Sequence, residues 1–238
     1  MNIRIINTLL IFMACSYIQT VCAQETMNQN WAAEKIKGVR FLPYRSYDGS
    51  PFLNDSWRPG KIEFADGEIA DSLFLKYSSF KDELVYFNKG ISTQIVIDKA
   101  SLNGFSFVED DGRICVFRKQ YFDGYMEGDR FFEVLSKGNP DLLVCRKVDL
   151  RTSSVYYDKS GILKNMTYDP AYQYYFYSPV KGYAFVRINQ GGLLAKFDKA
   201  SQKQIKKLLR KNKIKITGEE SFINAWKVVE KEGYEIAF

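Results

Sequence analysis

The densest group of charged side chains that could bind a partner lies near the C-terminus. Five cations occupy a segment with helical periodicity: Lys203, Lys206, Lys207, Arg210 and Lys211. Their charge suits an anionic partner such as lipopolysaccharide or a phospholipid headgroup. However, Ile205, Leu208 and Leu209 lie on the opposite side of the helical wheel, as in any helix that packs one face on a core. We therefore favour a solvated face, and we do not expect nucleic acid as a partner.

Tyrosine side chains form a second candidate binding surface. One predicted strand contains Tyr172, Tyr174, Tyr175 and Tyr177. Aromatic rings can stack on the faces of sugars, so this run is a candidate glycan-binding surface. Strands also favour aromatic residues because large rings pack well across a pleated sheet. The packing role is the preferred interpretation.

Acidic residues gather in two predicted turns. Residues 121–129 contain Asp123, Glu127 and Asp129, whose oxygens could bind Ca²⁺, but their spacing is not that of an EF-hand loop. Residues 109–111 form an acidic hairpin tip. A glycosidase would need two carboxyl groups opposed across a gap of about 5–9.5 Å. We expect polar loops at both places, with no metal and no cofactor.

Histidine is absent from the 238 residues, and this absence restricts the possible chemistry. It excludes a Ser-His-Asp triad, a Cys-His pair and a His-ligated zinc site. A carboxylate-dependent hydrolase acting on glycans is the enzyme class that remains. Such an enzyme should show a deep pocket with two facing carboxylates and at least one perturbed pKa. A binding module should instead show an exposed aromatic or basic patch without buried acids nearby.

The N-terminus has the layout of a secretory signal peptide. Residues 1–23 start with a cationic region, continue with an apolar stretch too short to span a bilayer, and end in small residues. We expect cleavage between Ala23 and Gln24, followed by a flexible segment over residues 24–34. A lipid anchor at Cys15 is the alternative, which the apolar residues after that cysteine disfavour. The protein should be periplasmic or associated with the outer membrane, without a transmembrane helix in the mature chain.

Two cysteines remain after cleavage, Cys115 and Cys145. An even number in an oxidising compartment would permit a disulfide. Each cysteine lies in a predicted strand, with one further strand between them. Strands two positions apart are about 9.6 Å apart, whereas a disulfide needs Cα atoms within about 7 Å. Two buried thiols are therefore favoured, and a bridge would mean that the two strands are neighbours.

The segments that carry these residues have the pattern of antiparallel β structure. Asp66-Gly67 between alternating residues predicts a hairpin, and turn residues separate further short strands. Predicted strands are 61–64, 68–77, 84–88, 91–98, 105–108, 114–119, 130–136, 142–150, 172–177, 183–188 and 193–197. We expect a mainly β fold (β-rich α+β), with residues 35–197 forming an antiparallel sandwich or a partly closed barrel.

The segment from residue 198 to 238 has a helical pattern and should pack on the β domain. Ser201 to Gln204 and Thr217 to Glu220 resemble capping boxes at the starts of two helices. Gly233 suits the end of the second helix. Lys213 to Ile216, between the helices, are interpreted as a short edge strand.

Several short motifs resemble a family of exported Gram-negative proteins with no assigned function. They are Gly49-Ser50-Pro51-Phe52-Leu53, Trp57, Gly60, the Asp66-Gly67 turn, Leu75-Lys76-Tyr77 and Asp82-Glu83-Leu84, with the lysine-rich helix and the acidic-start helix from Lys203 to Lys231. The resemblance covers nearly the whole mature chain. It implies export and a single β-rich unit, and it supplies no catalytic residues.

These observations predict an exported, non-catalytic binding or structural module of the cell envelope. Its partner would be an envelope glycan, a lipid headgroup or another envelope protein. The carboxylate-dependent hydrolase is the alternative. The formal net charge of +6 falls to +5 once the predicted signal peptide and its single arginine are removed, and so small an excess decides little about the partner.

Overall fold

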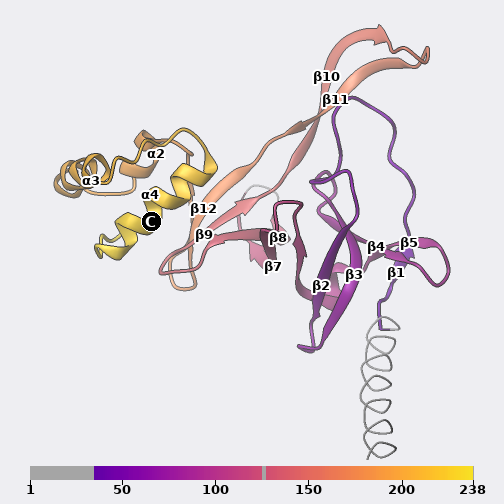
Figure 1. Ribbon diagram of the computed structural model, residues 1–238, viewed down its shortest axis with the longest axis horizontal. Helices are drawn as coiled ribbons and strands as arrows, with labels where there is room; N and C mark the ends of the chain where they lie inside the picture. Colours follow the sequence, from indigo (N-terminus) through magenta and orange to yellow (C-terminus); the bar gives the residue numbers. More distant parts are fainter. Residues whose placement is uncertain (1–34, 125–126, 238) are drawn as a thin grey trace, which may run out of the picture.

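The structure is a computed structural model that describes residues 35–124 and 127–237, and strands dominate it (Figure 1). In chain order the strands are β1 (Gly38–Arg40), β2 (Arg58–Phe64), β3 (Ile69–Ser78), β4 (Glu83–Asn88), β5 (Thr93–Ile97), β6 (Leu102–Val108), β7 (Ile114–Phe122), β8 (Gly128–Ser136), β9 (Asp141–Cys145), β10 (Val148–Tyr157), β11 (Leu163–Pro170), β12 (Gln173–Ser178) and β13 (Gly182–Val186). The helices are the 3₁₀ turn η1 (Lys99–Ser101), α2 (Gln190–Leu194), α3 (Lys199–Lys211) and α4 (Glu219–Lys231).

Eleven of the strands form one antiparallel sheet, in the order β1-β5-β4-β3-β2-β6-β7-β8-β9-β12-β13. Among the described residues β1 and β13 are the end strands, so the sheet does not close into a ring. The mainly antiparallel β fold with C-terminal helices is confirmed. The order departs from a simple meander in three places: β1 pairs with β5, β6 pairs with β2, and β9 pairs with β12 because β10 and β11 form a separate sheet.

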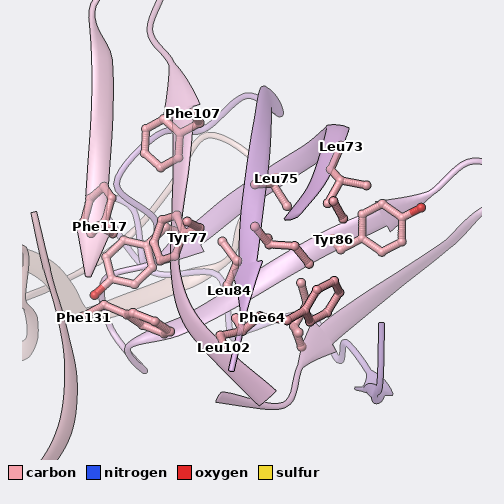
Figure 2. Packing of buried hydrophobic residues seen from close by; sticks show 14 of the residues in the cluster. Phe64, Leu73, Leu75, Tyr77, Leu84, Tyr86, Leu102, Phe107, Phe117 and Phe131 are labelled. Carbon is pink, nitrogen blue, oxygen red and sulfur yellow. The ribbon is translucent and has the colours of Figure 1, made fainter. Parts of the chain in front are cut away.

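The N-terminal part of the sheet has its own aromatic core (Figure 2). In β2 the burial alternates, because successive strand residues point to opposite faces. Phe105 and Phe117 stack with ring centroids 4.5 Å apart, and Tyr77 and Phe131 pack beside them. The sequence is rich in aromatic residues, and these large rings fill much of this core.

A second core lies under the C-terminal helices, at the other end of the sheet (Figure 1). Trp226 of α4 contacts Phe176 of β12 with centroids 4.6 Å apart, and Ile205 and Leu209 of α3 are buried. No described helix has both the length and the apolar character needed to cross a membrane.

The helix boundaries differ from those predicted. The side chain of Asp198, not Ser201, caps α3 by accepting hydrogen bonds from two backbone amides. Gly218 is the N-cap of α4, where the hydroxyl of Ser221 accepts hydrogen bonds from the backbone amides of Thr217 and Gly218. The α4 helix ends before Gly233, as predicted, since that residue has a φ of 77°.

Three predicted strands are corrected. The prediction for 193–197 is wrong because the side chain of Asn189 caps a short helix, α2, at this point. Residues 213–216 form no strand. The predicted strand 142–150 is two strands, β9 and β10, with a break at residues 146–147.

After that break the chain leaves the sheet as a projecting hairpin, β10–β11 (Figure 1). The sequence pattern is irregular there because most residues of β10 are exposed, so no buried face imposes an alternation. Val155, Tyr157 and Ile162 are among the exposed apolar residues near its tip.

The two cysteines are free thiols. Cys115 in β7 and Cys145 in β9 are separated by β8, as the distance argument predicted. Burial raises the pKa of both thiols, to about 11 for Cys145, so both are protonated at neutral pH. The predicted signal peptide, the cleavage site after Ala23, the lipid-anchor alternative and the flexible segment lie outside the described residues.

Candidate functional site

A polar cleft of about 440 Å³ lies where the two cores meet. It is bounded by the β6–β7 turn, by β8, by the residue after β9 and by the N-terminus of α4. We call it the Arg146 cleft. Its lining consists of Leu53, Asn54, Glu109, Asp110, Asp111, Arg113, Cys115, Glu133, Arg146, Tyr172 and Glu219. Its volume is within the range of about 300–1,000 Å³ typical of ligand sites.

A buried ion pair forms the floor of the cleft. Glu133 and Arg146 are only 2% and 5% exposed, and the Nε of Arg146 donates to Oε2 of Glu133 over 2.6 Å. Strand alternation places both side chains on the face that carries the cores. Glu133 lies two residues after the buried Phe131 of β8, and Arg146 lies two residues after the buried Val144 of β9, so each shares the face of that residue. Two charges at inward positions are stable only because each neutralises the other.

Helix α4 completes this pair with a second carboxylate. Both terminal nitrogens of Arg146 donate to Glu219, over 2.7 and 2.8 Å, in a bidentate arrangement. The hydroxyl of Tyr174 donates to the same carboxylate over 2.8 Å. Burial alone would raise the pKa of Glu219, but the hydrogen bonds and charge of Arg146 outweigh it and lower that pKa below 4.5. Glu219 also lies in the first turn of α4, where the helix dipole favours a negative charge.

The rim of the cleft is held by further arginine–carboxylate contacts. Arg113, whose side chain is half exposed, donates to the second oxygen of Glu133 over 3.0 Å. Arg58 donates to Asp110 over 2.7 Å and thereby lowers the pKa of that exposed carboxyl. Asn54 donates to Glu109 over 3.0 Å. The lining is therefore a preorganised set of charged and amide groups.

The β6–β7 turn at the rim of the cleft contains Gly112, whose φ is 81°. Residues with a Cβ rarely adopt this backbone conformation, so the turn favours glycine here. This turn contains the acidic hairpin tip at residues 109–111, which the sequence placed correctly between two strands. The sequence did not show that α4 and the end of β9 come to face it.

The four predicted ligand-binding tyrosines do not form one surface. Tyr172 lines the cleft, with Cζ of Arg146 over its ring at 4.8 Å from the centroid, and Tyr174 reaches the cleft through Glu219. Tyr175 and Tyr177 point to the opposite face of β12, into a cluster with Phe122 and Tyr183. Successive residues of a strand point to opposite faces of the sheet. Tyrosines that are neighbours in the sequence therefore do not form one binding surface here.

The five predicted cations, Lys203, Lys206, Lys207, Arg210 and Lys211, are all exposed on α3. Within the part of the chain that the structure describes, none of them forms an ion pair or lines the cleft. The buried residues Ile205 and Leu209 occupy the other side of the helix. This is the arrangement expected for a solvated face.

The other acidic segment, between β7 and β8, includes residues 125 and 126, which lie outside the described residues. Of its acids, Glu127 accepts a hydrogen bond from Tyr121. Across residues 35–124 and 127–237 no group of three or more Asp, Glu, Cys or His side chains is arranged to hold a metal ion.

Sequence reasoning missed the three residues that build the cleft: Glu133, Arg146 and Glu219. A usable signal was present for two of them. Glu133 and Arg146 are charges of opposite sign at inward positions of predicted strands, where apolar residues are expected. Such residues are buried only when paired, so each implies a partner.

No family model, no curated protein and no solved structure matches the chain. The resemblance to exported Gram-negative proteins remains a prediction, and the function has to be argued from the cleft alone.

Proposed function

We propose that the protein is an exported, non-catalytic binding module of the cell envelope that holds a neutral or amino-sugar glycan in the Arg146 cleft. The observation that carries this proposal is the fixed, electronegative lining of the cleft. Five carboxylates and two guanidinium groups line it, together with an amide and a tyrosine ring. Export is the prediction made from residues 1–23.

The charge of the lining selects among the predicted partners. An anionic lipid headgroup would meet an excess of carboxylates and would be repelled. A glycan offers many hydroxyl groups, which donate to carboxylates and accept from arginine and asparagine. Tyr172 adds a ring beside these groups, and sites of this kind combine aromatic surface with a few placed polar groups.

A hydrolase is less well supported, although the cleft does contain buried acids. A glycosidase needs a general acid whose pKa is raised. Here Arg58 and Arg146 lower the pKa of Asp110 and Glu219. Arg113 and Arg146 occupy both oxygens of Glu133. Carboxylates held in this way suit recognition better than proton transfer.

Co-sedimentation with purified peptidoglycan sacculi tests the proposal. We expect the protein to sediment with sacculi and not with vesicles of anionic phospholipid. Replacement Tyr172→Ala should weaken retention about two- to tenfold, because ring contacts of this kind contribute roughly 0.5–1.5 kcal/mol.

The matched control is Tyr157→Ala, which removes a 72% exposed tyrosine at the tip of the β10–β11 hairpin. It should leave retention unchanged. Equal loss in both variants, or no retention of the wild-type protein, would contradict the proposal.

A further inference from the structure

A second concave site lies on the opposite face of β8 and β9. Arg130 and Phe132 of β8 point into it, whereas Glu133 points into the Arg146 cleft. In the same way Cys145 and Lys147 flank Arg146 in sequence but line this other site. It is closed on the remaining side by Ser79 and its neighbours in the β3–β4 connection. We call it the Ser79 pocket.

The walls of the Ser79 pocket are largely aromatic. Phe122, Phe132 and Tyr175 pack around one another, with centroids 5.3 to 6.0 Å apart. The cavity of about 50 Å³ has room for roughly three to five water-sized groups. An apolar body of a few carbon atoms would fit between these rings.

One buried polar atom in this pocket has no partner. Ser79 is 3% exposed, and its Oγ makes no hydrogen bond with the residues that the structure describes. A buried hydroxyl without a partner costs free energy and is rare in folded proteins. Ser79 is one of the residues that line the pocket, so an occupant whose hydrogen-bond acceptor reaches this hydroxyl would satisfy it.

The other polar groups around the pocket are also donors. The amide oxygen of Gln173 accepts from the hydroxyl of Tyr175, which leaves its NH₂ group as a donor. Arg130 and Lys147 add two positive charges to the lining, the first paired with Asp82 at 3.8 Å and the second with Asp149 at 2.8 Å.

The single acid of the lining, Asp82, is already supplied with partners. Its carboxylate accepts from the hydroxyl of Tyr77 and from Lys99, each over 2.7 Å, and from the backbone amide of Phe131. It therefore adds little demand for a further donor. The lining therefore has two cations for its one acid, and the hydroxyl of Ser79 is without a partner among the described residues.

We propose that the Ser79 pocket binds a small monocarboxylate with a short apolar body. The aromatic walls hold the body, and the carboxylate accepts from Ser79, Gln173 and the nearby cations. This site is independent of the Arg146 cleft, so either proposal can fail without the other.

Titration with sodium butyrate, followed by isothermal calorimetry and by the melting temperature, tests this proposal on the full mature chain. We expect saturable binding with a Kd on the order of 1 mM. The neutral isostere butyramide should bind at least tenfold more weakly, because it lacks the charge that Arg130 and Lys147 recognise.

Two variants assign the binding to this pocket. Replacement Ser79→Ala should weaken butyrate binding about tenfold, and the apo protein should stay folded because the hydroxyl it removes has no partner. Replacement Lys147→Gln should weaken binding severalfold, whereas the control Lys203→Gln on α3 should not. Absence of saturable binding, equal binding of butyramide, or an unchanged Kd in Ser79→Ala would overturn the proposal.

Discussion

The two polar sites on opposite faces of β8 each contain a carboxylate whose pKa is shifted, and the two shifts are in opposite directions. In the Arg146 cleft, arginine outweighs burial and lowers the pKa of Glu219. In the Ser79 pocket, burial outweighs Lys99 and Tyr77 and raises the pKa of Asp82 above 3.8. Asp82 has two cationic neighbours, Lys99 at 2.7 Å and Arg130 at 3.8 Å, but its side chain is only 9% exposed. Glu219 is 27% exposed and accepts from both terminal nitrogens of Arg146. The difference therefore comes from the depth of burial and from hydrogen-bond geometry. The cleft is lined mainly by paired charges, while the pocket has aromatic walls with one acid and two cations.

Removing the arginine that unites the cleft should have the largest effect. Arg146→Met leaves Glu133 buried with Arg113 as its remaining cationic partner. We expect the free energy of unfolding to fall by about 3–5 kcal/mol, the usual cost of breaking a buried ion pair. Urea unfolding followed by circular dichroism measures it.

The control for this variant is Arg151→Met, which removes an arginine whose side chain is 61% exposed and paired with Asp169. An exposed pair of this kind should contribute no more than about 1 kcal/mol. The double variant Arg146→Met/Glu133→Leu should recover part of the loss, because it removes the unpaired charge. Equal losses in the free energy of unfolding for Arg146→Met and Arg151→Met would show that the ion pairs of the cleft do not stabilise the fold more than an exposed pair does.

Acid titration should separate the two carboxylates by the sign of their effects. The pKa of Glu219 is lowered in the fold, so its contribution is present above pH 4.5 and is lost as the pH falls below that value. The stability gap between wild type and Glu219→Gln should therefore shrink on acidification from pH 6 to pH 3.

For Asp82 the sign is reversed. Its raised pKa means that the folded state binds a proton more tightly than the unfolded chain does. On acidification toward pH 3.8 the wild-type protein should gain stability relative to Asp82→Asn. Denaturant unfolding across this pH range measures the stability difference between wild type and each of the two variants. If both differences changed in the same direction with pH, the comparison would be contradicted.

The smallest effect is expected on α3, whose charges contact solvent and not a partner carboxylate. Neutralising Lys206, Lys207, Arg210 and Lys211 with glutamine should change the free energy of unfolding by less than about 1 kcal/mol. Retention on anionic phospholipid vesicles, measured by sedimentation, should be the same for both proteins. A variant that loses retention would show that α3 docks on an anionic surface.

Local patterns were sufficient for much of the fold. The Asp66-Gly67 hairpin, the strands with one buried face and the apolar stripe of α3 all follow from period and turn chemistry. They could be predicted because each depends on residues close together in sequence. The β10–β11 hairpin could not, since most residues of β10 are exposed and need no alternation.

The cleft was beyond such reasoning for a different reason. Glu133 lies in β8, Arg146 follows β9 and Glu219 begins α4. The first two meet because β8 and β9 pair, and Glu219 joins them because α4 packs on the end of the sheet. Sequence alone marks the inward charges Glu133 and Arg146 as needing partners. It does not say which partner each one finds.

The most direct test of the account is a titration of the isotopically labelled protein with soluble peptidoglycan fragments, followed through its backbone amide resonances. The account predicts saturable shifts at Asn54, Gly112 and Tyr172, around the cleft, with none at Ser79 or along α3. Shifts confined to α3 or to the Ser79 pocket, or no shifts at any concentration, would contradict the assignment of the Arg146 cleft as the glycan site.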